Sequence, residues 1–585
     1  MKPLLSLVLA AALLAGCAPL AQKTRPEPPA QPQPQAEAEK AEAEDQDKAL
    51  AQLPNVDLTP KLLYGLLLAE IAGQRGQVVD SAEIYRDLAK ETRDPRIARR
   101  ATEIGLHSRR LDTALESARL WHETEPASGP ARQALIGLLA TQGRYDELKP
   151  LVADLLKEEP LRLRQNLSHL NRLFARGGDR KAIQGVVNEL TAPHLQFAEA
   201  HYARSVAAFE ARDLTTAREE ARQALELKPD WETAALLRAQ LTEDRNEALT
   251  ALGIFIAANP QAREARLAYA RALAADKRYA DARREFNTLL EQGAADPAKQ
   301  GDIVFAVAVL SLQLNDTQVA EKHLRRLVEI GHAEADKARY FLGQIAEEGK
   351  RPDEALKWFG EVGPGEHYLA ARLHAANVLA KQSRIDEARR HLQESEAANP
   401  RERAQLLIGE AQILREAGRL ADAHAALTAA LERQPDQPEL IYETALLAER
   451  LGRADELERR LRRLLEIKPD HAHAMNALGY SLADRNIRLD EARSLIEHAL
   501  EIAPNDPFIL DSMGWVLFRQ GQTQAALDTL NQAYGIRPDP EIAAHLGEVL
   551  WALGRKDEAR QTWDKARKEH PDNEALAETI KRFAR

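Results

Sequence analysis

Alanine- and leucine-rich stretches, each long enough for two helices, fill the last third of the chain and are separated by prolines at a nearly constant interval. The intervals are 35, 34, 35, 34 and 33 residues, between Pro400, Pro435, Pro469, Pro504, Pro538 and Pro571. A repeat of this length predicts a helix-turn-helix unit that is stacked many times. Because proline cannot continue a helix, we expect each proline to end the second helix of its unit.

Small residues recur at fixed separations inside these units. Two antiparallel helices approach closely only where a side chain is nearly absent, and large residues one turn away then fill the flanking grooves. Gly521 and Gly554 are expected to turn the first helix into the second, and Trp563 is expected in the core. The two clearest units are Gly514, Ala526, Ala533 and Pro538, with Met513, Leu517 and Leu530 between them, and Gly547, Ala559, Ala566 and Pro571, with Leu546, Leu550 and Trp563.

These positions resemble the tetratricopeptide consensus. The resemblance implies an all-α solenoid, a right-handed superhelix of about 15 units, well matched over residues 335–571 and degenerate over residues 60–334, with a C-terminal capping helix in residues 572–585. Upstream, Pro126, Pro160, Pro229 and Pro260 are also expected to end second helices. Gly479 and Ala492 are 13 residues apart instead of 12, so we expect Asn486, Ile487 and Arg488 to lengthen one turn.

The composition agrees with such an array. The 585 residues are 44% hydrophobic and 29% charged, and no stretches alternate like strands between turns. An array with only nearest-neighbour contacts needs no single deep core. The net charge of −11 argues against a nucleic-acid partner.

The N-terminus has the pattern of an export signal. Lys2 precedes an apolar run from Leu4 to Leu14, too short to span a bilayer and suited to a signal peptide, which we place at residues 1–16. The sequence from Leu14 to Cys17 resembles a bacterial lipobox, which implies cleavage before Cys17 and a lipid on its sulfur. The alternative is a secretory peptide that happens to end in cysteine, but Cys17 is the only cysteine and has no partner for a disulfide.

Residues 17–59 join this lipidation site to the array. They are rich in Pro, Gln and Glu and cannot bury a core, so we expect a disordered tether that holds the array off a membrane. Its acidic run is either a solubilising spacer or a partner site. Ala18 follows the lipidated cysteine where some lipoproteins carry Asp, and by resemblance this implies an outer-membrane anchor facing the periplasm.

Motifs for catalysis, cofactors and metals are absent from the sequence. There is no P-loop, no G-x-S-x-G and no H-E-x-x-H. His471 and His473 point about 200° apart on a helix, which disfavours a shared metal. Glu394-Ser395 and Glu116-Ser117 are similar to the Glu-Ser of lytic transglycosylases, but they lie within repeat helices. We therefore predict no enzyme, no cofactor and no metal, with an unrecognised catalytic site as the remaining alternative.

Recognition is expected on the first helix of each unit, which lines the inner wall of a stacked array. With the small residue of that helix at 0° and a step of about 100° per residue, positions between about 40° and 140° face the groove. Large rings there supply contact area and amide groups hold a peptide backbone. Trp515 and Phe518 have an alternative role, packing between neighbouring first helices. The predicted groove residues are Tyr442, Asn476, Tyr480, Phe508, Asp511, Trp515, Phe518, Arg519 and Trp551.

The whole layout resembles proteobacterial outer-membrane tetratricopeptide lipoproteins, some of which are adaptors of carboxyl-terminal processing proteases. The resemblance implies a scaffold that binds periplasmic proteins, including such a protease and its cell-wall hydrolase substrates. An assembly factor for a pilus, a secretin or an exopolysaccharide exporter shares the same sequence features. Both roles would use the groove and the lipid anchor.

Overall fold

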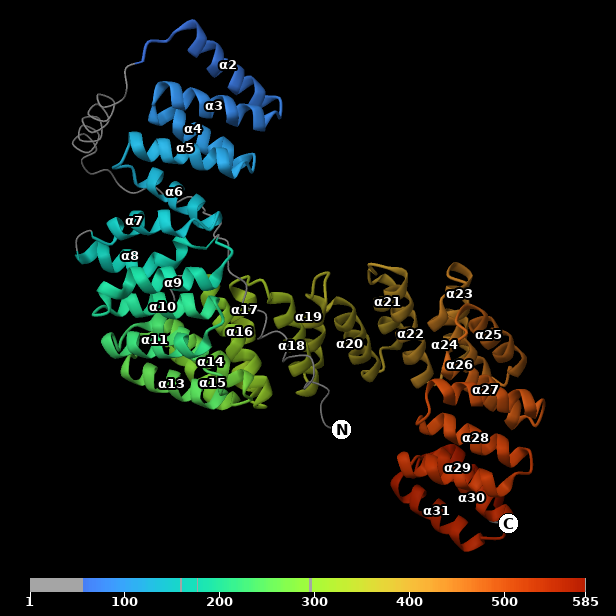
Figure 1. Ribbon diagram of the computed structural model, residues 1–585. Helices are drawn as coiled ribbons and strands as arrows, with labels where there is room; N and C mark the ends of the chain where they lie inside the picture. Colours follow the sequence, from blue (N-terminus) through green and yellow to red (C-terminus); the bar gives the residue numbers. More distant parts are fainter. Residues whose placement is uncertain (1–55, 158–159, 176, 294–296, 584–585) are drawn as a thin grey trace. The chain divides into compact units, whose positions relative to one another are not determined.

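The chain is all-α throughout the residues that the computed structural model describes, which are 56–157, 160–175, 177–293 and 297–583. Its helices follow one another in chain order and pack mainly against their neighbours in sequence (Figure 1). They form two compact units that divide between Asp316 and Thr317. The predicted signal peptide, the predicted lipidation site at Cys17 and the predicted tether up to residue 55 lie outside the described residues.

Unit 1 consists of consecutive helix pairs, α2 with α3 through α14 with α15, followed by α16. A 3₁₀ turn, η2, follows α9. The elements are α2 (Pro60–Gln74), α3 (Val78–Thr92), α4 (Pro95–His107), α5 (Leu111–Thr124), α6 (Gly129–Thr141), α7 (Tyr145–Leu155), α8 (Pro160–Leu173), α9 (Arg180–Thr191), η2 (Ala192–His194), α10 (Ala198–Glu210), α11 (Leu214–Leu227), α12 (Glu232–Leu241), α13 (Arg245–Ala258), α14 (Arg263–Ala275), α15 (Tyr279–Glu291) and α16 (Pro297–Gln313).

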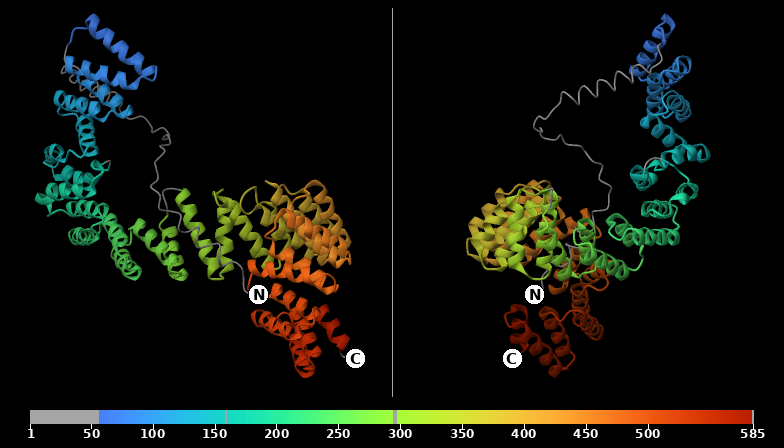
Figure 2. Two further views of the ribbon diagram at one scale, coloured as in Figure 1. Left: turned by 45° about the vertical axis from the view of Figure 1, so that its right-hand side comes forward. Right: turned by 90° about the vertical axis from the view of Figure 1, so that its left-hand side faces the viewer.

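Unit 2 begins with α17 and continues with helix pairs from α18 and α19 to α30 and α31, and α32 closes it. The helices of this unit follow one another in chain order, from yellow-green at α17 to red at the C-terminal end (Figure 2), and neighbouring helices are in contact. The elements are α17 (Thr317–Glu329), α18 (Ala335–Glu348), α19 (Pro352–Gly360), α20 (Tyr368–Lys381), α21 (Ile385–Glu394), α22 (Pro400–Glu416), α23 (Leu420–Arg433), α24 (Pro438–Arg450), α25 (Ala454–Ile467), α26 (Ala472–Asp484), α27 (Leu489–Ile502), α28 (Pro507–Arg519), α29 (Thr523–Ile536), α30 (Pro540–Ala552), α31 (Lys556–Glu569) and α32 (Glu574–Phe583).

The turns between paired helices follow the prediction. Gly521 and Gly554 take positive φ angles of 80° and 79° at the ends of α28 and α30, a conformation that costs glycine nothing. Between α26 and α27 the turn is one residue longer, and Asn486 and Arg488 both lie in the left-handed region. The expected lengthening of this turn is confirmed.

The prolines play two different roles. Pro435, Pro469, Pro504, Pro538 and Pro571 each follow the C-cap residue of a second helix, as expected. The prediction is wrong for Pro400 and Pro160, which are instead the first residues of α22 and α8. A proline is tolerated there because the first helical position has no intrahelical use for its N–H, and the side chain of Asn399 caps α22 by accepting from the Glu402 amide.

Glycines permit the close approach of paired helices. A Cβ atom at Gly514 would lie 2.5 Å from Cγ of Leu530, and one at Gly547 would lie 2.0 Å from Nε1 of Trp563. Trp563 is buried, as predicted. The constant spacing of small residues therefore marks the contact line between the first and second helix of each pair.

Candidate functional site

The first helices of unit 2 form the candidate site. Successive first helices, such as α26 with α28 and α30 with α32, pack against one another more extensively than successive second helices do. Helices on the inside of a curved stack are the ones that come closer together. We call the solvent-facing side of α24, α26, α28 and α30 the first-helix surface.

The predicted groove residues differ in how far solvent reaches them. Phe508 is 41% exposed, whereas Trp515 is 4% exposed and Asp511 is also buried. The six others are half-buried: Tyr442, Asn476, Tyr480, Phe518, Arg519 and Trp551.

A histidine that the sequence reasoning missed lies at the centre of this surface. Nδ1 of His545, on α30, lies 2.9 Å from Oδ2 of Asp511 on α28, and its Nε2 lies 3.4 Å from Oη of Tyr480 on α26. The Trp515 indole stacks on the imidazole with 4.4 Å between ring centroids. His545 falls at about 160° on the helical wheel, just outside the face predicted to line the groove. A predicted groove face that extended to about 160° would have included His545.

The charges of this group influence one another. Burial lowers the pKa of His545, but Asp511, together with Glu548 and Asp484, raises it, and the net result is a pKa above the ordinary histidine value. Burial, and then Asp484, Asp511, Glu449 and Glu541, raise the pKa of Tyr480. The group joins three successive first helices through a charged pair and a ring stack.

Some of the other predicted residues contact this group, and others lie apart from it. The Phe518 ring is 5.5 Å from that of Trp515, and the Arg519 guanidinium lies 5.8 Å from the Trp515 ring. Tyr442 packs on His471 at 5.3 Å. Trp551 instead lies 5.9 Å from Trp563 and belongs to an aromatic cluster that also includes Phe583 of α32.

Three polar atoms of this surface have no hydrogen-bond partner among the described residues. They are Oδ1 of Asn476, Nε1 of Trp515 and Nε of Arg519, and all three are buried. Buried polar groups in folded proteins nearly always find a partner. Ordered water or a bound partner can supply such hydrogen bonds.

A second candidate surface, in unit 1, was not anticipated. One side of α2 packs through Ala69 and Ala72, while its other side presents large apolar residues to solvent. A helix that is apolar all round is normally covered on all sides. The sequence could have indicated this surface, because α2 has no charged residue between Lys61 and Glu70. The exposed residues, between 40% and 68% accessible, are Leu63, Tyr64, Leu67, Leu68 and Ile71.

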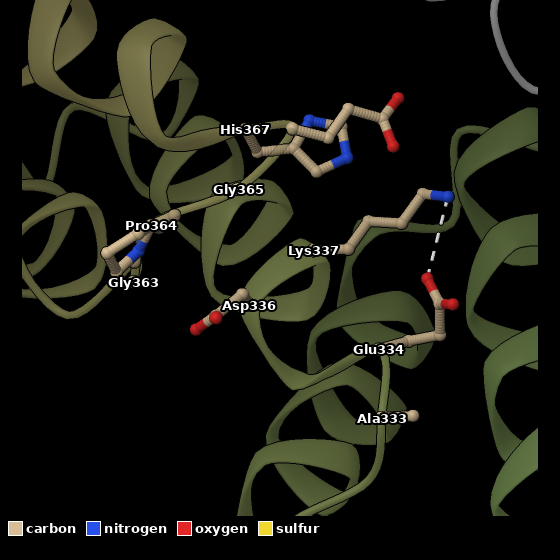
Figure 3. Close-up of a pocket in the computed structure, with 10 residues that line it drawn as sticks. Ala333, Glu334, Asp336, Lys337, Gly363, Pro364, Gly365 and His367 are labelled. Atoms are coloured by element: carbon tan, nitrogen blue, oxygen red, sulfur yellow. Dashed lines mark ion pairs between the residues drawn. The ribbon is translucent and has the colours of Figure 1, made fainter. Parts of the chain in front are cut away.

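Two hollows in the described part of the chain differ in size, and the larger one reaches the volume of an ordinary ligand pocket. One of about 150 Å³ lies beside α18, where the Lys337 and Glu334 side chains approach to 3.6 Å below the loop that carries His367 (Figure 3). Pockets for drug-sized ligands usually hold about 300–1,000 Å³. Another, of about 420 Å³, lies among α23, α24 and α25. Within the described residues, no cluster of three or more metal-binding side chains occurs and no helix is long and apolar enough to cross a bilayer.

Stacked helix pairs with aromatic and charged first-helix residues define a repeat scaffold of the protein-binding class. Comparison with known families identifies the repeat. Matches to the tetratricopeptide repeat cover residues 236–297, 308–362, 408–456, 457–507 and 517–582. The chain belongs to the tetratricopeptide repeat family, whose members bind protein partners and are typically non-enzymatic.

A relative supports the same assignment over most of the length. A TPR repeat-containing protein of Pseudomonas aeruginosa is 33% identical over 495 residues, which are 83% of this chain and 82% of the relative. Among solved structures, a TPR protein of Thermus thermophilus is 25% identical and matches 30% of this chain and 98% of its own, with a TM-score of 0.28. The Cut9–Hcn1 hetero-tetramer of the APC/C is 15% identical and matches 91% and 98%, with a TM-score of 0.32. At these TM-scores, the two structures carry no further argument.

Proposed function

We propose that the chain is a non-enzymatic scaffold, anchored by lipid to the outer membrane and facing the periplasm, that brings partner proteins together. The observation that carries this proposal is the first-helix surface, where Phe508 and Phe518 offer aromatic contact area beside buried polar groups without partners. Large aromatic anchors of this kind dominate the energetics of protein interfaces. A carboxyl-terminal processing protease and its cell-wall hydrolase substrates are the proposed partners.

The apolar side of α2 supports an adaptor with two partners. It lies in unit 1, and the first-helix surface lies in unit 2, so the chain has two separate candidate surfaces of different chemistry. Two proteins held on one chain meet at an effective concentration of up to about millimolar when the geometry allows. An assembly factor for an envelope machine would need to guide only one partner.

Variants of the two surfaces test the proposal. We expect Phe508→Ala with Phe518→Ala to weaken capture of one partner about tenfold or more, because each change removes an aromatic anchor. Leu63→Ser with Leu67→Ser should weaken capture of a different partner and leave capture of the first partner unchanged. The measurement is affinity capture from detergent-solubilised envelope followed by quantitative mass spectrometry.

Matched controls come from the second helices. Ile502 and Ile536 are about as exposed as Phe508, so Ile502→Ala with Ile536→Ala should leave both captures intact. If both surface variants lose the same single partner, the chain is an assembly factor rather than an adaptor. Unchanged capture in both variants would contradict a scaffold that works through these surfaces.

The anchor is a separate prediction, because it rests on Leu14 to Cys17 alone. Cys17→Ala should abolish incorporation of labelled palmitate. A chain that starts at Ala18 and is exported behind a cleavable signal peptide without a lipobox should leave the membrane fraction, since two or three acyl chains are needed for stable anchoring. Ala18→Asp serves as the control, and it should keep the lipid and change only the membrane in which the protein is found. Retention of the unlipidated chain in membranes would refute the anchor.

A further inference from the structure

The large apolar residues exposed on α2 occupy positions that are buried in later first helices. Positions in a first helix can be counted back from the residue of positive φ that follows it, which is Gly76 after α2 and Arg109 after α4. Tyr64, Leu68 and Ile71 stand 12, 8 and 5 residues before Gly76. The residues at the same distances before Arg109 in α4 are Ile97, Ala101 and Ile104.

Within the stack, these positions pack against the preceding helix pair. In α4, all three belong to a cluster with residues of α2 and α3. In α30, the equivalent of Tyr64 is Ile542, which clusters with Leu510 of α28 and Ala533 of α29. Among the described residues no helix pair precedes α2, so the interface that joins successive pairs is open at this end of unit 1 (Figure 1).

The open face of α2 is also wider than that interface. Leu63 and Leu67 stand 13 and 9 residues before Gly76, and their equivalents in α4 are Arg96 and Arg100. Both arginine side chains are exposed. Stacking therefore does not require apolar residues at these two positions, and the leucines of α2 indicate contact with a further apolar surface.

The part of the chain that precedes α2 supplies too little apolar surface to cover this face. Residues 17–55 contain three large apolar side chains, Leu20, Leu50 and Leu53, and they carry six carboxylates between residues 37 and 47. Burial of a carboxylate against leucines without a paired cation is costly. The occupant of the face must come from another molecule.

The C-terminal end of the array does not offer a matching face. Leu576 of α32 is buried, and in the described residues of α31 and α32 no large apolar side chain is exposed. A terminal helix with a polar outer face caps a solenoid. A second copy of the chain can therefore cover α2 with its own α2, but not with its C-terminal end.

No charge on the open face of α2 opposes contact with an identical face. Glu70 is the only carboxylate of α2, and it accepts hydrogen bonds from Tyr85 and Arg100 on the packed side of the helix. Lys61, at the start of the helix, is paired with Glu91 of α3. An uncharged apolar face complements a copy of itself, whereas a charged partner surface would lose its water without gaining an ion pair.

We propose that α2 docks against α2 of a second copy of this chain in a head-to-head dimer with two-fold symmetry. The ridges Leu63–Leu67–Ile71 and Tyr64–Leu68 interdigitate with the same ridges of the second copy, as in helix pairs that cross at about 50°. An interface of this kind uses the same patch on both copies and closes on itself.

The inference rests on the proposed function and names the partner that α2 captures. Since α2 follows the proposed tether directly, anchored copies present this helix at a similar distance from one membrane, which raises their effective concentration for each other. The dimer then carries two first-helix surfaces, so that two proteins bound to them are held on one assembly.

Sedimentation of the purified chain from Ala18 to Arg585 tests the proposal. We expect a reversible equilibrium between monomer and dimer at micromolar concentrations. Leu63→Ser with Leu67→Ser should raise the dissociation constant about a hundredfold or more, because four leucines leave the interface of the two copies. Circular dichroism should be unchanged, since both residues are exposed in the monomer.

A matched control comes from second helices of unit 1. Leu227 on α11 and Ile254 on α13 are at least as exposed as Leu63. Leu227→Ser with Ile254→Ser should leave the dissociation constant nearly unchanged. A chain that stays monomeric at high micromolar concentration, or equal effects of the two double variants, would overturn the proposal.

A single cysteine tests the head-to-head geometry. The chain that starts at Ala18 contains no cysteine, so any disulfide must join two copies. Leu67→Cys lies in the middle of the longer ridge, near the two-fold axis, and mild oxidation should give a covalent dimer because a disulfide needs Cα atoms within about 7 Å. Ile254→Cys is the control, and it should remain monomeric. Equal cross-linking of both variants would show random collision and contradict the geometry.

Failure of this inference differs from failure of the proposed function. If the chain is monomeric while Leu63→Ser with Leu67→Ser still lowers the capture of another envelope protein, α2 docks that protein, the scaffold stands and the second copy is wrong. If the chain dimerises but no surface variant changes the capture of any other envelope protein, the dimer stands and the scaffold is wrong.

Discussion

Gly547→Ala is expected to destabilise the pair α30 and α31 by about 2–3 kcal/mol. The new Cβ would lie 2.0 Å from Nε1 and 2.3 Å from Cε2 of Trp563. Trp563 cannot move away easily, because it is 3% exposed and its ring packs against those of Trp551 and Phe583. Alanine is the better helix former by about 1 kcal/mol, which offsets only part of the clash. Hydrogen exchange of α30 and α31 peptides, together with urea denaturation, measures the loss.

Gly535→Ala is the matched control for this substitution. Gly535 is also helical, in α29, but no heavy atom lies within 4 Å of the place that a Cβ would take, so alanine there should be neutral or stabilising. Trp563→Phe should partly rescue Gly547→Ala, so that the two changes together cost less than their sum. A neutral Gly547→Ala would mean that the helices separate at little cost and that the small-residue line is not a packing constraint.

The fold was predictable because its determinants are local and repeated. Gly547 and Trp563 lie within one helix pair, so the small and the large side chain could be matched from the sequence alone. The role of Pro400 was not predictable from spacing, since a proline fits both after a helix and at its first position. Its place at the start of α22 depends on α21 ending earlier, at Glu394.

The candidate site was predictable only to the level of a helix face. The wheel placed Asp511 and Trp515 on one face of α28, but it assigned no contacts between successive helix pairs. The pairing of Asp511 with His545 joins residues of two successive helix pairs, and it buries Trp515 beneath a ring from the next first helix. Such contacts depend on the offset between stacked helices, which the interval of 34 residues does not specify. The exposed face of α2 was missed because repeat spacing does not specify what covers the helix at the end of an array.

His545→Gln is expected to destabilise the stack of α26, α28 and α30 by about 3 kcal/mol near pH 6, since it leaves the buried Asp511 carboxylate without its charged partner. Asp511 raises the pKa of His545 above the ordinary histidine value of about 6.5, and the neighbouring Glu548 and Asp484 act in the same direction. A raised pKa in the folded state gives stability that is fully present below the unfolded value and is lost as pH rises through the folded value.

The cost of His545→Gln should therefore shrink as pH rises toward 9, because the wild-type imidazole then loses the charge that stabilised it. Urea denaturation of both proteins between pH 6 and 9, with hydrogen exchange of α28 and α30 peptides to localise the effect, measures this dependence. His473→Gln is the control, since His473 is exposed on α26 and should change stability little at any pH. A cost that stays constant or grows with pH would show that His545 is neutral in the fold and that its ring, rather than its charge, holds the first helices together.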